Sequence, residues 1–408
     1  MTITESTVSS VPNLWATLDH YQIPLGLDGT PYEHLEKLRD QAEVIPVEWS
    51  DAYGGHWVVG DYSAIVEIVQ NTKDFSNKQN TLPNFETEGV GMIITNDDGV
   101  THKQNLRVIA KAFSPKAIEE YTEKLRQTAN RLIDERIELG HGDIASWIAD
   151  ELPAALAVIL LGLVDEGSDD LRRWVGAVTD VHNPESSAAA RQEMLKCARD
   201  LIARRRVEPG DDVFSMVVNT SLDGEPIPEN DLISYFIIIL LGSIENTARL
   251  LASSFWRLAW DVELRRRLVA HPELIDGAVD EFIRFYAPAI SGRTVAKEVT
   301  VRGRTMLPGQ MVMLWHPVAN RNRSVFPNPD TFVFDRTPNR HLAFSTGIHR
   351  CLGAHLVRME VKVAIGELLR RIPMFALDPG QSTEWQVGSV SGAHKVPIIF
   401  PVGQREGV

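Results

Sequence analysis

Apolar residues recur every three or four positions through most of this chain, and that period is typical of amphipathic helices. Alternation with a period of two is limited to residues 55–59 and 299–306, which predicts two short strands. The centre of the segment 229–260 is apolar on every face, so we expect a long helix that is buried on all sides. The pattern predicts a mainly α protein with small β-sheets, and it places the other helices at residues 62–70, 102–113, 115–139, 145–161, 168–181, 188–206, 262–271, 274–286 and 352–372.

Composition narrows the classes of protein and partner. The chain has 408 residues, of which 44% are hydrophobic, and no linker, repeat or charge block divides it. A net charge of −14 argues against nucleic acid, because phosphate contacts need clustered Lys and Arg. The N-terminal residues 1–12 are polar and the longest apolar run is residues 236–241, so we expect neither a secretory signal nor a membrane span. Cys197 and Cys351 are far apart in unlike settings, which predicts no disulfide framework and a cytoplasmic location.

The pattern of residues around Cys351 is one that binding of a metal by its sulfur would explain. The sequence around it is FSTGIHRCLGAHLVR at residues 344–358, and the predicted helix at 352–372 begins directly after it. A helix N-terminus favours an anionic sulfur, and Gly347 and Gly353 let the backbone turn tightly around it. A thiolate needs a strongly electropositive partner, and haem iron is one such partner. The alternative is that Cys351 is an ordinary buried thiol, as most single cysteines are.

The same segment resembles the haem-binding loop of the cytochrome P-450 superfamily, whose usual form is Phe-x-x-Gly-x-His-x-Cys-x-Gly-x-x-Leu-x-Arg. The resemblance implies a single domain over residues 1–408 with the cytochrome P-450 fold, in which a long central helix lies over the haem. It also implies that heme b (iron protoporphyrin IX) is the cofactor and that the Cys351 thiolate is the axial ligand of its iron. The matching positions are Phe344, Gly347, His349, Cys351, Gly353, Leu356 and Arg358.

Further residues match the cofactor site of the superfamily. The resemblance implies that His102, Arg293 and His349 bind the haem propionates, which need cationic or hydrogen-bonding partners. Phe344 and Gly353 are expected to complete the haem loop. The superfamily often has an Arg four residues after the first His, but this chain has Leu106 there. Arg107 follows one step later, about 100° further round the helix, so we do not expect it to contact the haem.

Glu281 and Arg284 match another motif, Glu-x-x-Arg, and their spacing puts both side chains on one face of a helix. The resemblance implies that they form a buried network with Arg336 that holds the loop beneath the haem, a structural role. The alternative is an exposed ion pair, which would contribute at most about 1 kcal/mol.

The middle of the long predicted helix carries Glu245, Asn246 and Thr247, which we predict to be the catalytic residues. They resemble the acid and alcohol pair with which the superfamily delivers protons for the cleavage of dioxygen. Glu245 matches the acid, but Asn246 takes the place of the hydroxyl, and Thr247 is one residue late and turned by about 100°. An amide cannot pass on a proton as a hydroxyl does, so Asn246 either orders a water or bonds the substrate. The alternative is that Glu245 and Asn246 satisfy one another, although a charge in so apolar a helix is costly without a purpose.

Several segments look like the bacterial cineole hydroxylase among the monoterpene-oxidising members, including residues 53–59, 245–249, 255–261 and 338–342. This resemblance implies hydroxylation of a C–H bond in a small apolar monoterpenoid such as cineole. Phe85 stands where that relative has a Tyr able to bond the ether oxygen, so the alternative is another small terpenoid or aromatic substrate. Each predicted substrate contact is equally suited to a protein core, and these residues are Phe85, Met92, Trp174, Ile238, Leu241, Ile290, Val295 and Val390.

The source of electrons follows from motifs that the chain lacks. It has no flavin or nicotinamide fingerprint and no cysteine cluster for an iron–sulfur centre. A monooxygenase of this kind therefore uses O2 and a separate ferredoxin or flavodoxin with an NAD(P)H reductase. One alternative is a peroxide-driven haem-thiolate peroxygenase, but such enzymes have an Arg-Pro pair in place of Glu245 and Asn246. Another is a haem sensor or carrier, which would not need Glu245.

Overall fold

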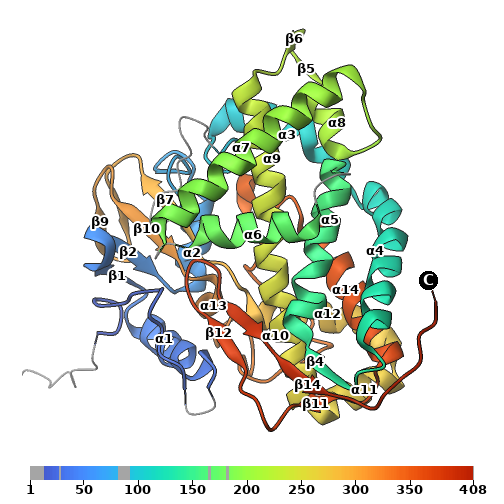
Figure 1. The fold of residues 1–408 in the computed structure, drawn as a ribbon. Helices are drawn as coiled ribbons and strands as arrows, with labels where there is room; N and C mark the ends of the chain where they lie inside the picture. The colour runs from blue at the N-terminus through green and yellow to red at the C-terminus, as the bar shows by residue number, and fades with distance from the viewer. Residues whose placement is uncertain (1–12, 27–28, 81–91, 164–166, 181–182, 408) are drawn as a thin grey trace, which may run out of the picture.

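The computed structural model describes residues 13–26, 29–80, 92–163, 167–180 and 183–407. Helices form most of this part of the chain, the largest sheet lies on one side of it, and smaller strand pairs lie at the top and bottom of the view (Figure 1). The predicted fold class, mainly α with small β-sheets, is confirmed. The α-helices are α1 (Tyr32–Val44), α2 (Tyr62–Gln70), α3 (Gly99–Ala110), α4 (Pro115–Arg136), α5 (Glu151–Leu161), α6 (Ser168–Thr179), α7 (Pro184–Val207), α8 (Val213–Val218), α9 (Glu229–Ser243), α10 (Glu245–Trp260), α11 (Val262–Ala270), α12 (Ile275–Tyr286), α13 (His316–Ala319) and α14 (Ala354–Arg371).

The long central helix is divided in two. α9 and α10 follow one another through the middle of the molecule (Figure 1), but the backbone departs from regular helix at Ile244, with φ −90° and ψ −69°. Gly242 and Ser243 come directly before the break, and Ser243 Oγ donates to the carbonyl oxygen of Ile239 at 2.6 Å. Gly and Ser pairs are common places for a helix to bend. Within the described residues, Glu229–Trp260 is the one helical stretch long and apolar enough to cross a membrane, and 67% of its most apolar window is buried in the protein, as in a core helix.

The largest sheet has the strand order β1 (Val47–Ser50), β2 (His56–Val59), β10 (Met311–Leu314), β7 (Ser291–Val295) and β3 (Phe75–Ser76). β10 runs parallel to β2, while its other neighbour β7 is antiparallel and places Arg293 opposite Val312. The strand predicted at residues 299–306 is a hairpin instead, because Arg302 and Gly303 both have positive φ, of 49° and 78°, and form a turn. The strands are β1 (Val47–Ser50), β2 (His56–Val59), β3 (Phe75–Ser76), β4 (His141–Asp143), β5 (Ser221–Leu222), β6 (Glu225–Pro226), β7 (Ser291–Val295), β8 (Val299–Val301), β9 (Arg304–Met306), β10 (Met311–Leu314), β11 (Ala376–Leu377), β12 (Glu384–Gln386), β13 (Gly392–Lys395) and β14 (Pro397–Ile399).

Two of the predicted helices begin differently from what the pattern indicates. The segment predicted as a helix from 145 begins with a π-helical turn, Ala145–Ala149, before α5. A 3₁₀ turn at Gly347–His349 comes shortly before Cys351, and α14 begins at Ala354, two residues later than the pattern predicts. Cys351 therefore lies in a short irregular link between these two elements.

Glu281, on α12, is the centre of a buried ion cluster. Arg284 donates to both of its carboxylate oxygens, from Nε to Oε2 at 2.8 Å and from Nη2 to Oε1 at 2.7 Å, and neither side chain is exposed. Arg336 Nε lies 3.1 and 3.2 Å from the same two oxygens. Asn339 Nδ2 and the Val333 backbone N–H complete the shell around the carboxylate. The structure thus brings the two arginines to a single carboxylate in the interior.

This cluster fixes the chain that leads into the Cys351 loop. Arg336 also donates to the carbonyl oxygens of three residues between 327 and 331. Arg284 Nη1 donates to the carbonyl oxygen of Asn320 at 2.9 Å, and Asn320 Oδ1 accepts from the backbone N–H of Leu342 at 2.6 Å. Residues 320–342 are therefore attached to α12 by charged hydrogen bonds directly before the segment that carries Cys351.

We expect Glu281→Ala to lower the free energy of unfolding by about 3–5 kcal/mol, because it leaves two buried guanidinium groups without their carboxylate. Haem incorporation should fall as well, since the segment before Cys351 loses its anchor. Denaturant unfolding and the haem content of purified protein measure the two effects. Asp276→Ala is the matched control on the same helix: the exposed pair of Asp276 with Lys362, at 2.6 Å, contributes little. A fully haem-loaded Glu281→Ala protein with the parent's stability would contradict the structural role of the cluster.

Candidate active site

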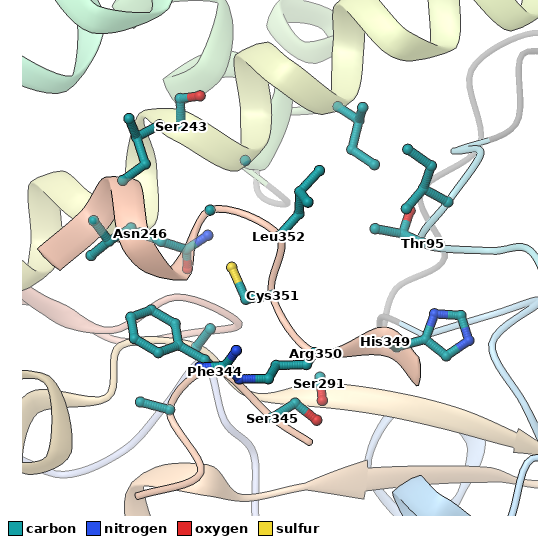
Figure 2. A pocket seen from close by; sticks show the side chains of 18 of the residues that line it. Thr95, Ser243, Asn246, Ser291, Phe344, Ser345, His349, Arg350, Cys351 and Leu352 are labelled. Carbon is teal, nitrogen blue, oxygen red and sulfur yellow. The ribbon is translucent and has the colours of Figure 1, made fainter. Parts of the chain in front are cut away.

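Cys351 lies in the wall of a cavity of about 410 Å3, and its Sγ points into that cavity (Figure 2). The side chain has accessible surface only because it faces this cavity, and protein surrounds it on its other sides. Burial raises the pKa of the thiol, whereas a hydrogen bond from the Gly353 backbone and the charges of Arg350 and Arg358 lower it. A metal cation at the sulfur would stabilise the thiolate form.

The loop around Cys351 is held in one conformation by its own residues. The Cys351 backbone N–H donates to the carbonyl oxygen of Phe344 at 2.9 Å. Gly347 has a φ of 74°, and a Cβ there would lie 3.0 Å from the carbonyl oxygen of Val69, so a larger residue does not fit. The Arg358 guanidinium carbon is 4.9 Å from the centroid of the Phe344 ring, which itself lines the cavity. The sulfur is therefore presented from a rigid loop.

One end of the cavity is polar and carries a buried cation. His102 of α3 and His349 lie edge to face, with ring centroids 4.2 Å apart, and both line the cavity together with Arg293 of β7. Burial lowers the pKa of Arg293 to about 10 and that of His349 to about 4. Within the described chain, His102 Nδ1 and His349 Nε2 have no hydrogen-bond partner, since Asp98 Oδ1 is 3.7 Å from the latter. A buried cation beside two unpaired ring nitrogens suits the propionates of a haem. Arg107 is exposed and does not line the cavity, whereas Leu106 does.

Ser291 and His316 extend this polar end, although the sequence pattern does not single them out. Ser291 precedes Arg293 by two residues on β7 and so shares its face of the strand. His316 Nε2 is 2.9 Å from Ser291 Oγ, and its Nδ1 has no partner in the described residues. Burial, with the nearby charge of Arg293, lowers the pKa of His316 to about 3. The alternation of the strand could have indicated Ser291, but no local signal points to His316.

The helices α9 and α10 supply another wall. Asn246 and Thr247 both line the cavity, even though the expected 100° rotation had placed Thr247 elsewhere, because the cavity extends along the helix. Among the described residues, Asn246 Oδ1 and Thr247 Oγ1 are buried without a hydrogen-bond partner. Glu245 does not line the cavity: its Oε1 accepts a hydrogen bond of 2.8 Å from Gln386 Nε2. Burial raises the pKa of the Glu245 carboxyl, and the bond from Gln386 opposes that rise. The structure therefore shows no mutual pairing of Glu245 with Asn246.

Most of the predicted substrate contacts lie away from this cavity. Ile238 lines it, while Phe85 falls outside the described residues. Leu241 is on another face of α9, and Ile290 does not line the cavity, although Ala289 and Ser291 on either side of it do. Met92, Trp174, Val295 and Val390 also do not line it. Trp174 Nε1 donates to Glu193 at 2.8 Å, Val295 is packed in the core of the sheet, and Val390 pairs with Ala289. The apolar lining instead includes Leu106, Ile109, Phe113, Ile239, Leu250 and Ala289.

Comparison with known proteins agrees with this geometry. The family model for cytochrome P450 matches residues 261–390. The chain is 31% identical over 380 residues to mycinamicin IV hydroxylase/epoxidase of Micromonospora griseorubida, which covers 90% of this chain and 94% of that protein. It is also 31% identical over 280 residues to the polyketide biosynthesis cytochrome P450 PksS of Bacillus subtilis, covering 68% and 69%. The crystal structure of CYP109E1 from Bacillus megaterium in complex with testosterone is similar, with a TM-score of 0.84 and 26% identity over 91% of this chain and 98% of that one.

The chain therefore belongs to the cytochrome P450 family, and it is a cytochrome P450 monooxygenase. The resemblance to the superfamily is confirmed, but these comparisons do not show the implied closeness to the cineole hydroxylase. The fold implies a haem with cysteine thiolate ligation, and the family uses O2 and redox partner proteins. The residues described above fit that cofactor, because a thiol faces the cavity and its polar end holds the buried Arg293 beside two ring nitrogens without a partner in the described residues.

We expect Cys351→Ser and Cys351→His to abolish monooxygenation even where haem is retained, because neither side chain supplies the electron density of a thiolate. The absorption spectrum of the reduced, carbon monoxide-treated protein should lose its thiolate signature. Cys197→Ser, in the buried face of α7, should keep both the spectrum and the rate. Near-normal turnover in either Cys351 variant would contradict the assignment of the ligand.

Proposed function

We propose that this protein hydroxylates an unactivated C–H bond in a small apolar substrate, with Cys351 as the axial ligand of heme b. The observation that carries the proposal is that the Cys351 sulfur, the polar groups of Asn246 and Thr247 and an apolar lining all face one cavity. When bound, a thiolate-ligated haem supplies the activation of dioxygen, since the thiolate favours O–O cleavage. The domain that carries this activity is taken to span residues 1–408.

The chain's own residues would hold the cofactor and manage protons. His102, Arg293 and His349 would bind its propionates, since they line the polar end of the cavity. Glu245 would be the proton source, and Asn246 and Thr247, which line the cavity next to it in the helix, would order a water that passes the proton on. Each hydroxylation consumes one O2, two electrons and two protons and releases one water. The electrons come from a separate ferredoxin or flavodoxin with its reductase.

The substrate is inferred from the lining. Ile109, Phe113 and Leu250 offer hydrocarbon surface and no charge, and the haem would share this cavity with the substrate, so the space left beside it favours a compact apolar compound. We take monoterpenoids such as cineole as the first candidates, on the sequence resemblance at residues 53–59 and 255–261. Testosterone, which the related structure binds, represents a larger class. A low-spin to high-spin shift of the haem with cineole and none with testosterone is the expected result, and the reverse would overturn the size class.

Substitutions at Glu245 and Asn246 can distinguish the roles of the two residues. Glu245→Gln keeps the shape but cannot titrate, so oxygen-dependent turnover should fall by about 10²-fold or more. Asn246→Ala should reduce the rate less and alter the position of hydroxylation, while Asn246→Thr should stay close to the parent. Product per NADH, with products resolved by chromatography, measures all three. Should Asn246→Ala divert most electrons to peroxide while Glu245→Gln stays coupled, the two roles are reversed. Efficient product formation from peroxide alone would favour a peroxygenase instead.

A further inference from the structure

A single side chain, Gln386 of β12, joins the carboxyl group of Glu245 to a turn of the chain. Its Nε2 donates to Glu245 Oε1 at 2.8 Å and to the carbonyl oxygen of Val390 at 3.3 Å. An amide nitrogen carries two hydrogens, so both donors are used and the orientation of the amide is set. Glu245 is thereby tied to residues 387–391, which connect β12 with β13.

Residues 387–391 are also hydrogen-bonded to the wall of the cavity. Ala289 and Val390 form an antiparallel β-bridge. Two further backbone hydrogen bonds, of 3.0 and 2.7 Å, join Ile290 to Ser389 and Ser391 to Pro288. The wall segment 288–291 contributes three of its four residues to the lining of the cavity. The backbone of Ser389 and Ser391 is therefore bonded to the cavity wall, and Val390, which lies between them, is bonded to Gln386 and through it to the carboxyl group.

Close packing of β13 on α10 is what lets Gln386 reach Glu245. A Cβ on Gly392 would lie 2.8 Å from the Cβ and the carbonyl oxygen of Arg249, so a larger residue would push the strand away from the helix. Arg249 Nη1 donates to the carbonyl oxygen of Ala393 at 2.8 Å, and the Ala393 N–H donates to Ser253 Oγ at 3.0 Å. The hairpin is thus fixed one turn along the helix from Glu245.

The groups around Glu245 determine the pKa of its carboxyl. Burial raises the pKa of the carboxyl, and the bond from Gln386 is the largest of the influences that lower it, ahead of the charge of Arg249 and a hydrogen bond with Thr179. Arg249 is itself paired with Asp150, which takes up part of its charge. Tyr21, which faces the group from the N-terminal segment, is neutral, since burial raises its pKa.

We propose that Gln386 is the positioning residue of Glu245 and couples the orientation of its carboxyl group to the cavity wall at residues 288–291. This rests on the proposed function, in which Glu245 supplies the proton. A substrate in contact with the wall moves the turn at Val390, and Gln386 transmits that movement to the acid. Proton delivery then depends on whether the cavity is filled.

Gln386→Met removes both donors and keeps the length of the side chain. We expect oxygen-dependent turnover to fall about tenfold, the size that loss of one hydrogen bond to a charged group produces, with more NADH consumed per product. Haem content and the absorption spectrum should not change. In a Glu245→Gln background the same substitution should cause no further loss, because Gln386 acts through Glu245.

Infrared difference spectra provide a readout that does not depend on turnover. The carboxyl band of Glu245, identified by its loss in Glu245→Gln, should shift when substrate is added to the parent and should not respond in Gln386→Met. Gln381→Met is the matched control, since Gln381 Nε2 donates to Asp378 at 2.9 Å in the same way but on the exposed surface. It should leave rate, coupling and band unchanged.

The outcomes separate this proposal from the one it rests on. A slow Glu245→Gln enzyme together with a parent-like Gln386→Met enzyme would overturn only the role of Gln386. Additive losses in the double variant would also overturn it, because they would show an action independent of Glu245. A Glu245→Gln enzyme with the parent's rate would overturn the proton-delivery role itself and this inference with it.

Discussion

The carboxylate of Glu281 is the interaction on which the geometry of the site depends. It is wholly buried and pairs with Arg284 on its own helix and with Arg336 on the segment that precedes the Cys351 loop. A buried pair of this kind adds little net stability compared with apolar packing, but it tolerates only one arrangement of its partners. The position of the sulfur is thus set by charge pairing on one side and by the rigid turn at Gly347 on the other.

The sequence predicts the helices and strands better than the breaks and turns between them. The helical period locates α2 at its observed ends, because apolar spacing is a local signal; in the structure the Asp61 side chain caps the helix by accepting from the Ala64 N–H. The break at Ile244 was missed because the apolar pattern runs through it unchanged. The hairpin at 299–306 was read as one strand because its turn places Arg302 at a positive φ, a conformation that Arg seldom adopts. Such features depend on backbone conformation that residue type only weakly dictates.

The same distinction holds within the site. Cys351, His349 and Phe344 belong to one loop with fixed spacing, so a short motif is enough to find them. Of the predicted substrate contacts that the structure describes, Ile238 alone lines the cavity. The other lining residues come from elements brought together only by the fold. Gln386 is 141 residues from Glu245, and His316 is 25 residues from Ser291. Periodicity carries no information on contacts of that kind.

The acceptors on α10 have a consequence for what leaves the site. Asn246 Oδ1 and Thr247 Oγ1 have no protein donor within the described residues, and each costs about 1–3 kcal/mol when it is buried unpaired. An apolar surface cannot satisfy either of them, whereas the water proposed to lie beside them can. An apolar substrate that enters the cavity should therefore displace other water and leave this one in place. The helix thus selects which water leaves when substrate binds.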